Sequence, residues 1–140
     1  MIQRSQSVPA TSVALETLRS FLAEFWAEQQ LPAESLFPFE LSLEEIFINV
    51  VSYGAAPGTT MPPVEVKLEF DGQRVTLTCT DHGVAFDPLQ KCAPDLDAKL
   101  EDRPVGGLGI FLVREFMDEV HYERANSANV LRISRRVSPG

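Results

Sequence analysis

A glutamate and an asparagine stand four residues apart in the segment LEEIFINVVSYG. On a helix, Glu45 and Asn49 would lie on one face. An amide oxygen can ligate Mg²⁺ where a triphosphate supplies the negative charge, and a carboxylate one turn away could accept a proton from an attacking hydroxyl group or water. Glu44 lies about 100° round the helix from Glu45, so both carboxylates cannot face one ion. The alternative is a solvated polar stripe on an amphipathic helix, extended by Ser42 and Ser52.

The second group of residues lies in TCTDHGVAFDP, where Asp81 ends an alternating segment and Gly83 follows two residues later. An ionised aspartate only accepts hydrogen bonds, which suits the exocyclic amine of adenine and a bridging water. A glycine lets a flat ring approach the backbone closely. The alternative is an aspartate-initiated turn that closes a strand.

The third group is the glycine-rich stretch RPVGGLGIFLVREF, in which Gly106, Gly107 and Gly109 precede an apolar segment. Glycines ahead of a helix leave its first N–H groups open to an anion, and the helix dipole favours negative charge there. A Walker loop would require a lysine after the glycines, and a dinucleotide fingerprint would require a third glycine where Leu112 stands. The alternative is a flexible hinge packed on a sheet.

Composition sets limits on the partners of the chain. Its 140 residues suffice for one domain with its own core. Twenty acidic against 12 basic residues give a net charge of −8, which argues against nucleic acid and anionic membranes as direct partners. Cys79 and Cys92 are too far apart for a CxxC pair, and Cys79 is expected to be a small buried hydrophobe. Because no leader or membrane-spanning pattern is present, we expect a cytoplasmic protein.

These groups must be positioned by helices and strands that the periodicity predicts. Helices are expected after an N-cap at Thr11 or Ser12, from about 36 to 52 and from about 108 to 117. Asp-Gly between two alternating segments predicts a hairpin, and a second hairpin is expected near EVHYER and NVLRISRRV, whereas MIQRSQSVPA gives only a weak strand signal. The segment from Asp81 to Val105 reads as a long loop, with a lid over about residues 84–105.

This order of elements predicts an α+β fold. We expect a two-layer α/β sandwich with a mixed, largely antiparallel sheet and about three helices on one face, forming a single domain over residues 1–140. The expected core positions of the first two helices are Leu15, Leu18, Phe21 or Leu22, Phe25 or Trp26, Leu43, Ile46, Phe47 and Val50.

Each motif alone has an ordinary alternative, but their order resembles the GHKL (Bergerat) ATP-binding fold. That superfamily includes type II topoisomerases, heat-shock chaperones of the ninety-kilodalton class and histidine kinases. Over nearly its whole length, the chain is most similar to the stand-alone anti-sigma regulatory factors, which are serine/threonine protein kinases.

The resemblance implies roles for individual residues. It makes Asn49 the Mg²⁺ ligand and Glu45 the general base, and it places Asp81 on the adenine amine with Gly83 beneath the ring. It assigns the phosphates to the glycine-rich stretch, with contacts from Gly107 and Gly109, a loop shaped by Gly106, and Arg103 in reach of a phosphate.

The sequence departs from the pattern of its relatives at two places. Tyr53 stands where many relatives have a histidine before the glycine that ends the first box, which would alter the edge of the pocket. The final hairpin, RANSANVL, has no glycine where relatives often place one. The register of its second strand, and any residue there that bridges to adenine through water, are therefore left open.

The resemblance also implies a function. The chain would be an anti-sigma regulatory factor that uses Mg²⁺-ATP to phosphorylate a serine on a STAS-type anti-anti-sigma protein and that sequesters a sigma factor. One alternative is an ATP-binding module that sequesters a partner without phosphoryl transfer. Another is an ATPase or a histidine-kinase fragment, against which we note no phospho-accepting histidine on a helix pair upstream. Relatives often dimerise, so a homodimer is an option, with Phe25 or Trp26 as contacts if exposed rather than in the core.

Overall fold

A computed structural model describes residues 1–53, 61–85, 87 and 107–137. The α-helices in this part are α1 (Leu15–Glu28), α2 (Leu36–Tyr53) and α3 (Gly107–Phe116), and short 3₁₀ turns at Ser12–Ala14 and Ala33–Ser35 lead into the first two. The strands are β1 (Ile2–Val8), β2 (Val64–Phe70), β3 (Arg74–Asp81), β4 (Glu119–Ala125) and β5 (Ala128–Arg136). The expected helices and both hairpins are confirmed, and the weak signal at the start of the chain is a full strand.

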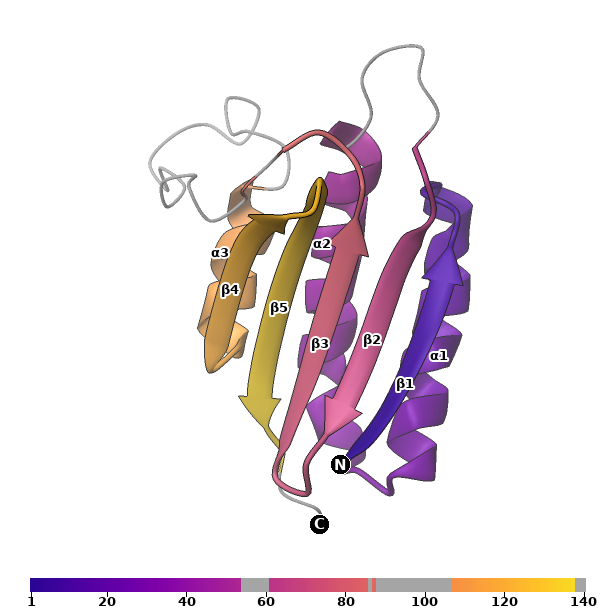
Figure 1. The fold of residues 1–140 in the computed structure, drawn as a ribbon. Coiled ribbons are helices and arrows are strands. Elements are labelled where there is room, and N and C mark those ends of the chain that lie inside the picture. Colours follow the sequence, from indigo (N-terminus) through magenta and orange to yellow (C-terminus); the bar gives the residue numbers. More distant parts are fainter. Residues whose placement is uncertain (54–60, 86, 88–106, 138–140) are drawn as a thin grey trace.

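The strands form one sheet in the order β1-β2-β3-β5-β4. Every pairing between described strands is antiparallel, so the sheet is not mixed. The described helices cover one face of this sheet (Figure 1). The prediction of a two-layer α/β sandwich is therefore confirmed, and the register of the final strand is fixed by the pairing of Asp81 with Asn129.

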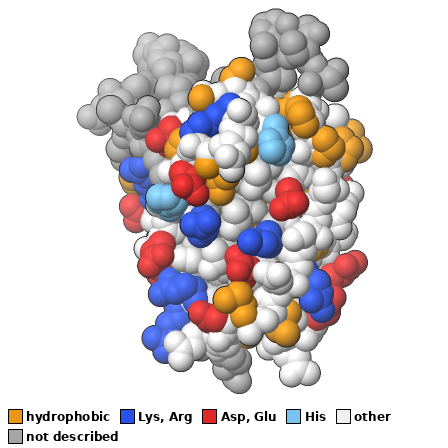
Figure 2. Space-filling model, viewed as in Figure 1, with side chains coloured by type: hydrophobic (Ala, Val, Ile, Leu, Met, Phe, Trp, Pro, Cys, Tyr) orange, Lys and Arg blue, Asp and Glu red, His pale blue; other side chains and the backbone are white. Residues whose placement is uncertain are grey.

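The other face of the sheet is open and polar. Along β2, Val64, Val66 and Leu68 are buried against the helices, whereas Glu65 between them is exposed. Side chains of both charge signs are scattered over the open face in Figure 2. An alternation of buried apolar and outward polar residues is what one covered and one solvated face require.

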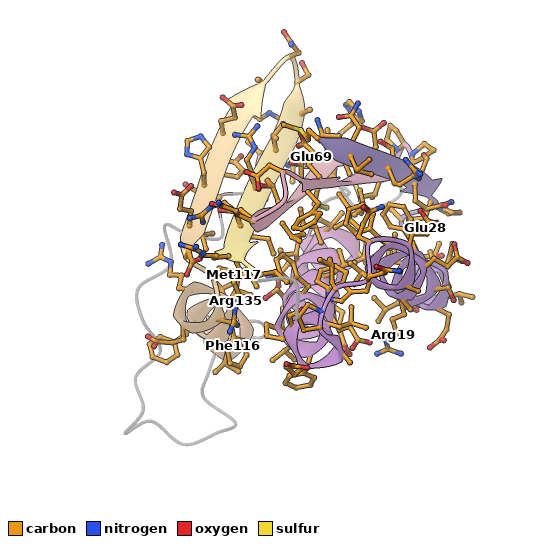
Figure 3. All side chains as sticks on the ribbon, turned by 90° about the horizontal axis from the view of Figure 1, so that it is seen from below. Arg19, Glu28, Glu69, Phe116, Met117 and Arg135 are labelled. Atoms are coloured by element: carbon orange, nitrogen blue, oxygen red, sulfur yellow. The ribbon has the colours of Figure 1, made fainter. Side chains whose placement is uncertain are left out.

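The core fills the layer between sheet and helices, as the side chains in Figure 3 show. All the expected core residues of α1 and α2 are buried except Leu15 and Val50, which are partly buried against the core. Trp26 is 3% exposed, donates to Ser35 Oγ at 2.8 Å and packs on Phe39 with ring centroids 5.2 Å apart. Trp26 thus joins α1 to α2, and because Phe25 is buried as well, the two residues do not form an exposed contact surface.

The start of the first helix differs from the expectation. Thr11 precedes the 3₁₀ turn with an extended backbone but makes no side-chain cap bond, and α1 itself has Ala14 at its N-cap position. The turn supplies the transition instead, because Ala14 N–H bonds to the Thr11 carbonyl at 3.0 Å. Within the described residues, every helix is too short or too polar to cross a lipid bilayer.

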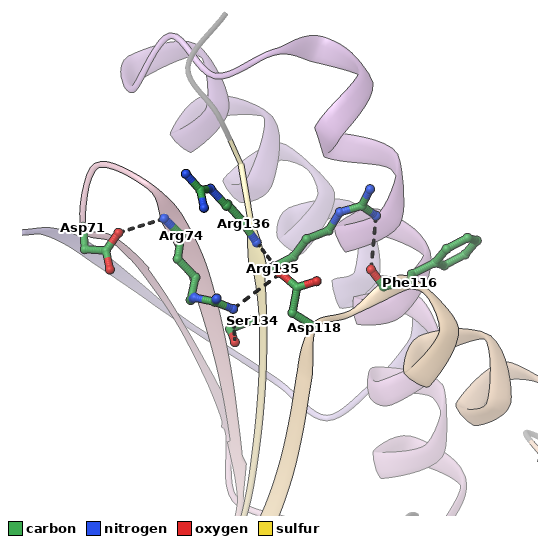
Figure 4. Close-up of polar contacts among 7 residues, drawn as sticks. All are labelled: Asp71, Arg74, Phe116, Asp118, Ser134, Arg135 and Arg136. Carbon is green, nitrogen blue, oxygen red and sulfur yellow. Dashed lines mark hydrogen bonds and ion pairs between the residues drawn. The ribbon is translucent and has the colours of Figure 1, made fainter.

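Polar contacts at one end of the sheet fix the direction of α3 (Figure 4). Arg135 of β5 donates to the carbonyl of Phe116 at 3.1 Å, and Asp118 accepts from the backbone N–H of Arg136 at 2.7 Å. At the same end, Asp71 accepts the N–H of Arg74 at 2.7 Å in the β2–β3 turn, where Gly72 has a φ of 98°. With its C-terminus held here, α3 begins at the opposite end of the sheet (Figure 1).

Candidate functional site

The side of α2 turned away from α1 carries buried polar residues. Glu44 accepts a hydrogen bond from Arg19 of α1 at 3.1 Å, so it marks the side facing α1. At about 100° per residue, Asn49 and Ser42 lie about 140° and 160° from Glu44, and so on the side of α2 away from α1. The helix α3 lies on that side of α2 (Figure 3). Asn49 is 4% exposed and Ser42 is 0% exposed. A solvated polar stripe is therefore wrong for these two residues, although Ser52 is exposed.

Asn49 presents an unused acceptor on this side of α2. Its Oδ1 atom is buried and has no hydrogen-bond partner among the described residues. Leaving a buried acceptor unpaired costs about 1–3 kcal/mol, and a bound ligand that pairs with it would remove that cost. A neutral amide oxygen is a suitable Mg²⁺ ligand. The residue thus fits the cation that the resemblance assigns to it.

Glu45 lies one turn before Asn49 and is half-buried. Burial raises the pKa of the Glu45 carboxyl group above its ordinary value. The negative charge of neighbouring Glu44 is the second cause and acts in the same direction. A carboxylate with a raised pKa holds a proton more strongly and is a better base. The environment of Glu45 therefore suits proton abstraction, as the sequence predicts for this residue.

Asp81 is 6% exposed at the end of β3. Its Oδ1 atom accepts the N–H of Gly83 at 3.0 Å, which is the aspartate-initiated turn considered as the alternative, and also accepts Asn129 Nδ2 at 3.0 Å. No hydrogen bond from a described residue reaches Oδ2. The turn and a ligand-binding role are thus compatible, because each uses a different carboxylate oxygen.

The β4–β5 hairpin contributes residues that sequence reasoning missed. The Asn129 amide bonds to Asp81, to the Val84 carbonyl at 2.8 Å and to the Tyr122 hydroxyl group, and Arg124 donates to the Gly83 carbonyl at 2.8 Å. The signal that could have found Asn129 is the strand register, which places it directly opposite Asp81. The sequence left that register open.

The elements that carry Asn49, Asp81 and Gly107 share one end of the molecule. The C-terminal ends of α2 and β3 and the N-terminal end of α3 all lie at the upper end in Figure 1. Gly107 and Gly109 form the first turn of α3, so the helix begins at the glycines rather than after them. A helix N-terminus attracts anions through its free N–H groups and its dipole.

Arg103, expected to reach a phosphate, and Gly106, expected to shape the glycine-rich loop, lie outside the described residues, as does most of the expected lid over 84–105. Of that lid the structure describes 84, 85 and 87. The roles assigned to Arg103, Gly106 and the lid stay predictions.

Comparison with known proteins gives consistent results. Residues 8–135 match the histidine kinase-like ATPase domain family. Serine/threonine-protein kinase BtrW of Bordetella bronchiseptica is 30% identical over 84% of this chain and 85% of its own length. Serine-protein kinase RsbW of Staphylococcus aureus is 23% identical over 81% of this chain and 74% of its own.

Among solved structures, the RsbU and RsbW domains of Rv1364c from Mycobacterium tuberculosis align with a TM-score of 0.65 at 17% identity. The alignment covers 98% of this chain and 33% of that longer chain, so this chain spans about a third of its length. At this identity the likeness concerns the fold alone.

Proposed function

Because the chain belongs to the family of histidine kinase-like ATPase domains, we propose that it is an ATP-dependent protein serine/threonine kinase. The observation that carries the proposal is the pair on α2. The buried amide oxygen of Asn49, which has no hydrogen-bond partner in the described part of the chain, lies one turn from Glu45, whose pKa is raised by burial. A ligand for Mg²⁺ and a base for a hydroxyl group are the two side-chain functions that phosphoryl transfer requires.

Each end of the nucleotide would meet a different part of the chain. Asp81 would accept the adenine amine through Oδ2, and the N–H groups of the first turn of α3, at Gly107 and Gly109, would face the phosphates. Asn49 would hold Mg²⁺, which when bound to the triphosphate supplies charge neutralisation at the transferred group.

Glu45 would take the proton of the attacking serine. As the bond between serine Oγ and the γ-phosphorus forms, the bond from that phosphorus to the bridging oxygen of ADP breaks, and the hydroxyl proton passes to the Glu45 carboxylate. Such a positioned base contributes about 10²–10⁴-fold to the rate.

The protein substrate that we propose is a STAS-type anti-anti-sigma protein, with a sigma factor as the sequestered partner. This follows from the resemblance to anti-sigma regulatory factors and from relatives named serine kinases. The phosphoryl group adds about −1.5 to −2 charge to the substrate, and the kinase carries −8. Like-charge repulsion would then favour release of the phosphorylated partner.

The proposal is tested by incubating the chain with labelled ATP and candidate STAS proteins and scoring phosphoserine. Glu45→Gln should keep ATP binding by calorimetry and lose about 10²–10⁴-fold in transfer rate. Glu40→Gln on the same helix is the matched control and should transfer normally. Transfer at the wild-type rate by Glu45→Gln would exclude the base role, and ATP binding without transfer by the wild type to any STAS partner would favour the sequestering module.

A further inference from the structure

A chain of side-chain hydrogen bonds runs from Tyr122 through Asn129 to Asp81. We propose that Tyr122 and Asn129 are positioning residues that hold the Asp81 carboxylate ready for one exocyclic amine, and so set the preference of the site for adenine. The inference rests on the proposed function, because it concerns the same nucleotide site.

The orientation of the Asn129 amide is determined by its partners. Nδ2 lies 3.0 Å from Asp81 Oδ1 and 2.8 Å from the Val84 carbonyl oxygen, and both of these atoms only accept hydrogen bonds when the aspartate is ionised. The amide must therefore turn its NH₂ group toward them. Its Oδ1 atom then accepts from the Tyr122 hydroxyl group, which locks the amide in that orientation.

The locked amide in turn decides which oxygen of Asp81 is left for a ligand. Oδ1 is occupied by two donors, Asn129 Nδ2 and the N–H of Gly83, each at 3.0 Å. Those two bonds fix the plane of the carboxylate and leave Oδ2 as the acceptor that no described residue uses. An acceptor held in place before binding loses less conformational freedom on binding, which increases affinity.

The same hairpin also holds the backbone that follows Asp81. Arg124 donates to the Gly83 carbonyl at 2.8 Å, while Asn129 holds the carbonyl of Val84. The backbone at Gly83 and Val84 is thus tied to β4 and β5, next to the carboxylate. A ring stacked against Gly83 would meet a backbone that is already in place.

The chemistry of this arrangement discriminates between purines. Adenine carries a donor amine at the ring position where guanine carries a carbonyl oxygen, and a carbonyl oxygen facing Asp81 Oδ2 would leave two acceptors unpaired. Rejection of a ligand that leaves buried polar groups unpaired is strong. Loss of the Tyr122 or Asn129 bonds should therefore reduce the part of the ATP affinity that comes from the adenine amine.

The contribution of the amine to affinity can be measured directly. Calorimetry with the full chain compares ATP with purine riboside triphosphate, which lacks only the amine, and with GTP. Wild type should bind ATP about 10-fold or more tightly than the analogue, since one hydrogen bond to a charged group supplies that much. Tyr122→Phe should reduce this ratio by about 3-fold, and Asn129→Asp, which brings two carboxylates together, should bring it close to one.

Controls separate positioning from folding. Asn126→Asp makes the same amide-to-carboxylate change in the β4–β5 turn and should keep the wild-type ratio. Thermal melts of Tyr122→Phe should show a folded protein, and its affinity for the analogue without the amine should stay unchanged. A variant that weakens ATP and the analogue equally would overturn the positioning role.

The inference and the proposed function fail differently. Wild-type chain that binds ATP no better than the analogue would remove the role of Asp81 in the proposed site, and the positioning role with it. Wild-type chain that prefers ATP, with Tyr122→Phe and Asn129→Asp preferring it equally, would leave the proposed function intact and refute the inference alone.

Discussion

The two ends of the candidate site differ in how their polar groups are paired. At the end of β3, the chain itself supplies donors to Asp81 Oδ1, and the β4–β5 hairpin holds the backbone at Gly83. On α2, the buried amide oxygen of Asn49 has no hydrogen-bond partner among the described residues. One region is thus pre-organised by its own hydrogen bonds, and the other keeps an acceptor open.

This difference indicates that the two regions bind different parts of the ligand. A rigid flat base is recognised best by groups already held in place, because ordering them on binding would reduce affinity. A metal–phosphate group instead replaces water and pairs with protein oxygen atoms when it arrives, and those atoms lower stability until then. We therefore expect variants at the β3 end to alter selectivity and variants on α2 to alter metal dependence.

The largest effect on nucleotide affinity is expected for Asn49→Ala. Loss of the amide oxygen should weaken ATP binding in Mg²⁺ by about 100-fold, since a hard cation loses a direct oxygen ligand. With the metal chelated, the variant and the wild type should bind ATP alike in calorimetry. Ser42→Ala, also at a buried oxygen without a described partner, is the control and should bind Mg²⁺-ATP normally. Tight Mg²⁺-ATP binding by Asn49→Ala would exclude the metal assignment.

Asp81→Asn should have the next largest effect, on adenine recognition. The amide oxygen can still accept from Gly83 and Asn129, but the NH₂ group then replaces Oδ2 and faces the adenine amine, donor against donor. ATP affinity should fall about 10- to 100-fold, whereas the melting temperature should change by only a few degrees. Asp71→Asn, in the turn at the other end of β3, is the control. Unchanged ATP affinity in Asp81→Asn would show that the base binds elsewhere.

The fold was predictable because its elements are encoded locally. The 3.6-residue periodicity of α1 and α2 and the Asp-Gly turn before β3 each specify a structure without reference to distant residues. The N-terminal cap of the first helix was not predictable in this way, because a 3₁₀ turn at Ser12–Ala14 replaced the side-chain cap. The strictly antiparallel order also depends on long-range pairing, in which β5 inserts between β3 and β4.

The candidate site was predictable where its residues follow a motif. Asp81 and Gly83 are two residues apart, and Glu45 and Asn49 are one helical turn apart, so their neighbourhood follows from spacing. Asn129 is 48 residues from Asp81, and only the β3–β5 register brings them together. A departure from the pattern of relatives, in the final hairpin, was the one sequence signal at that position.

A smaller effect is expected on the stability of Glu45→Gln. The pKa of Glu45 is raised in the folded protein, so the unfolded chain releases this proton at a lower pH and ionisation opposes folding at neutral pH. Glutamine removes that cost and should raise the melting temperature at pH 7 by about 2 °C. The gain should shrink as the pH falls through the raised pKa toward the ordinary glutamate value of about 4.3. If Glu45→Gln melted below the wild type at pH 7, this prediction would be wrong.

The smallest effect, and the finest test of the α2 side, comes from Glu44→Gln. The Glu44 charge is the second cause, after burial, of the raised pKa of Glu45. Removing it should lower that pKa, so the acid limb of the phosphoryl-transfer rate, where Glu45 becomes protonated, should move to lower pH. Glu16→Gln is the control, because Glu16 bonds to the same Arg19 at 2.8 Å but is not a cause of the Glu45 shift. Equal displacement of the limb in both variants would attribute it to Arg19, and a limb that stays in place in Glu44→Gln would mean that another group titrates there.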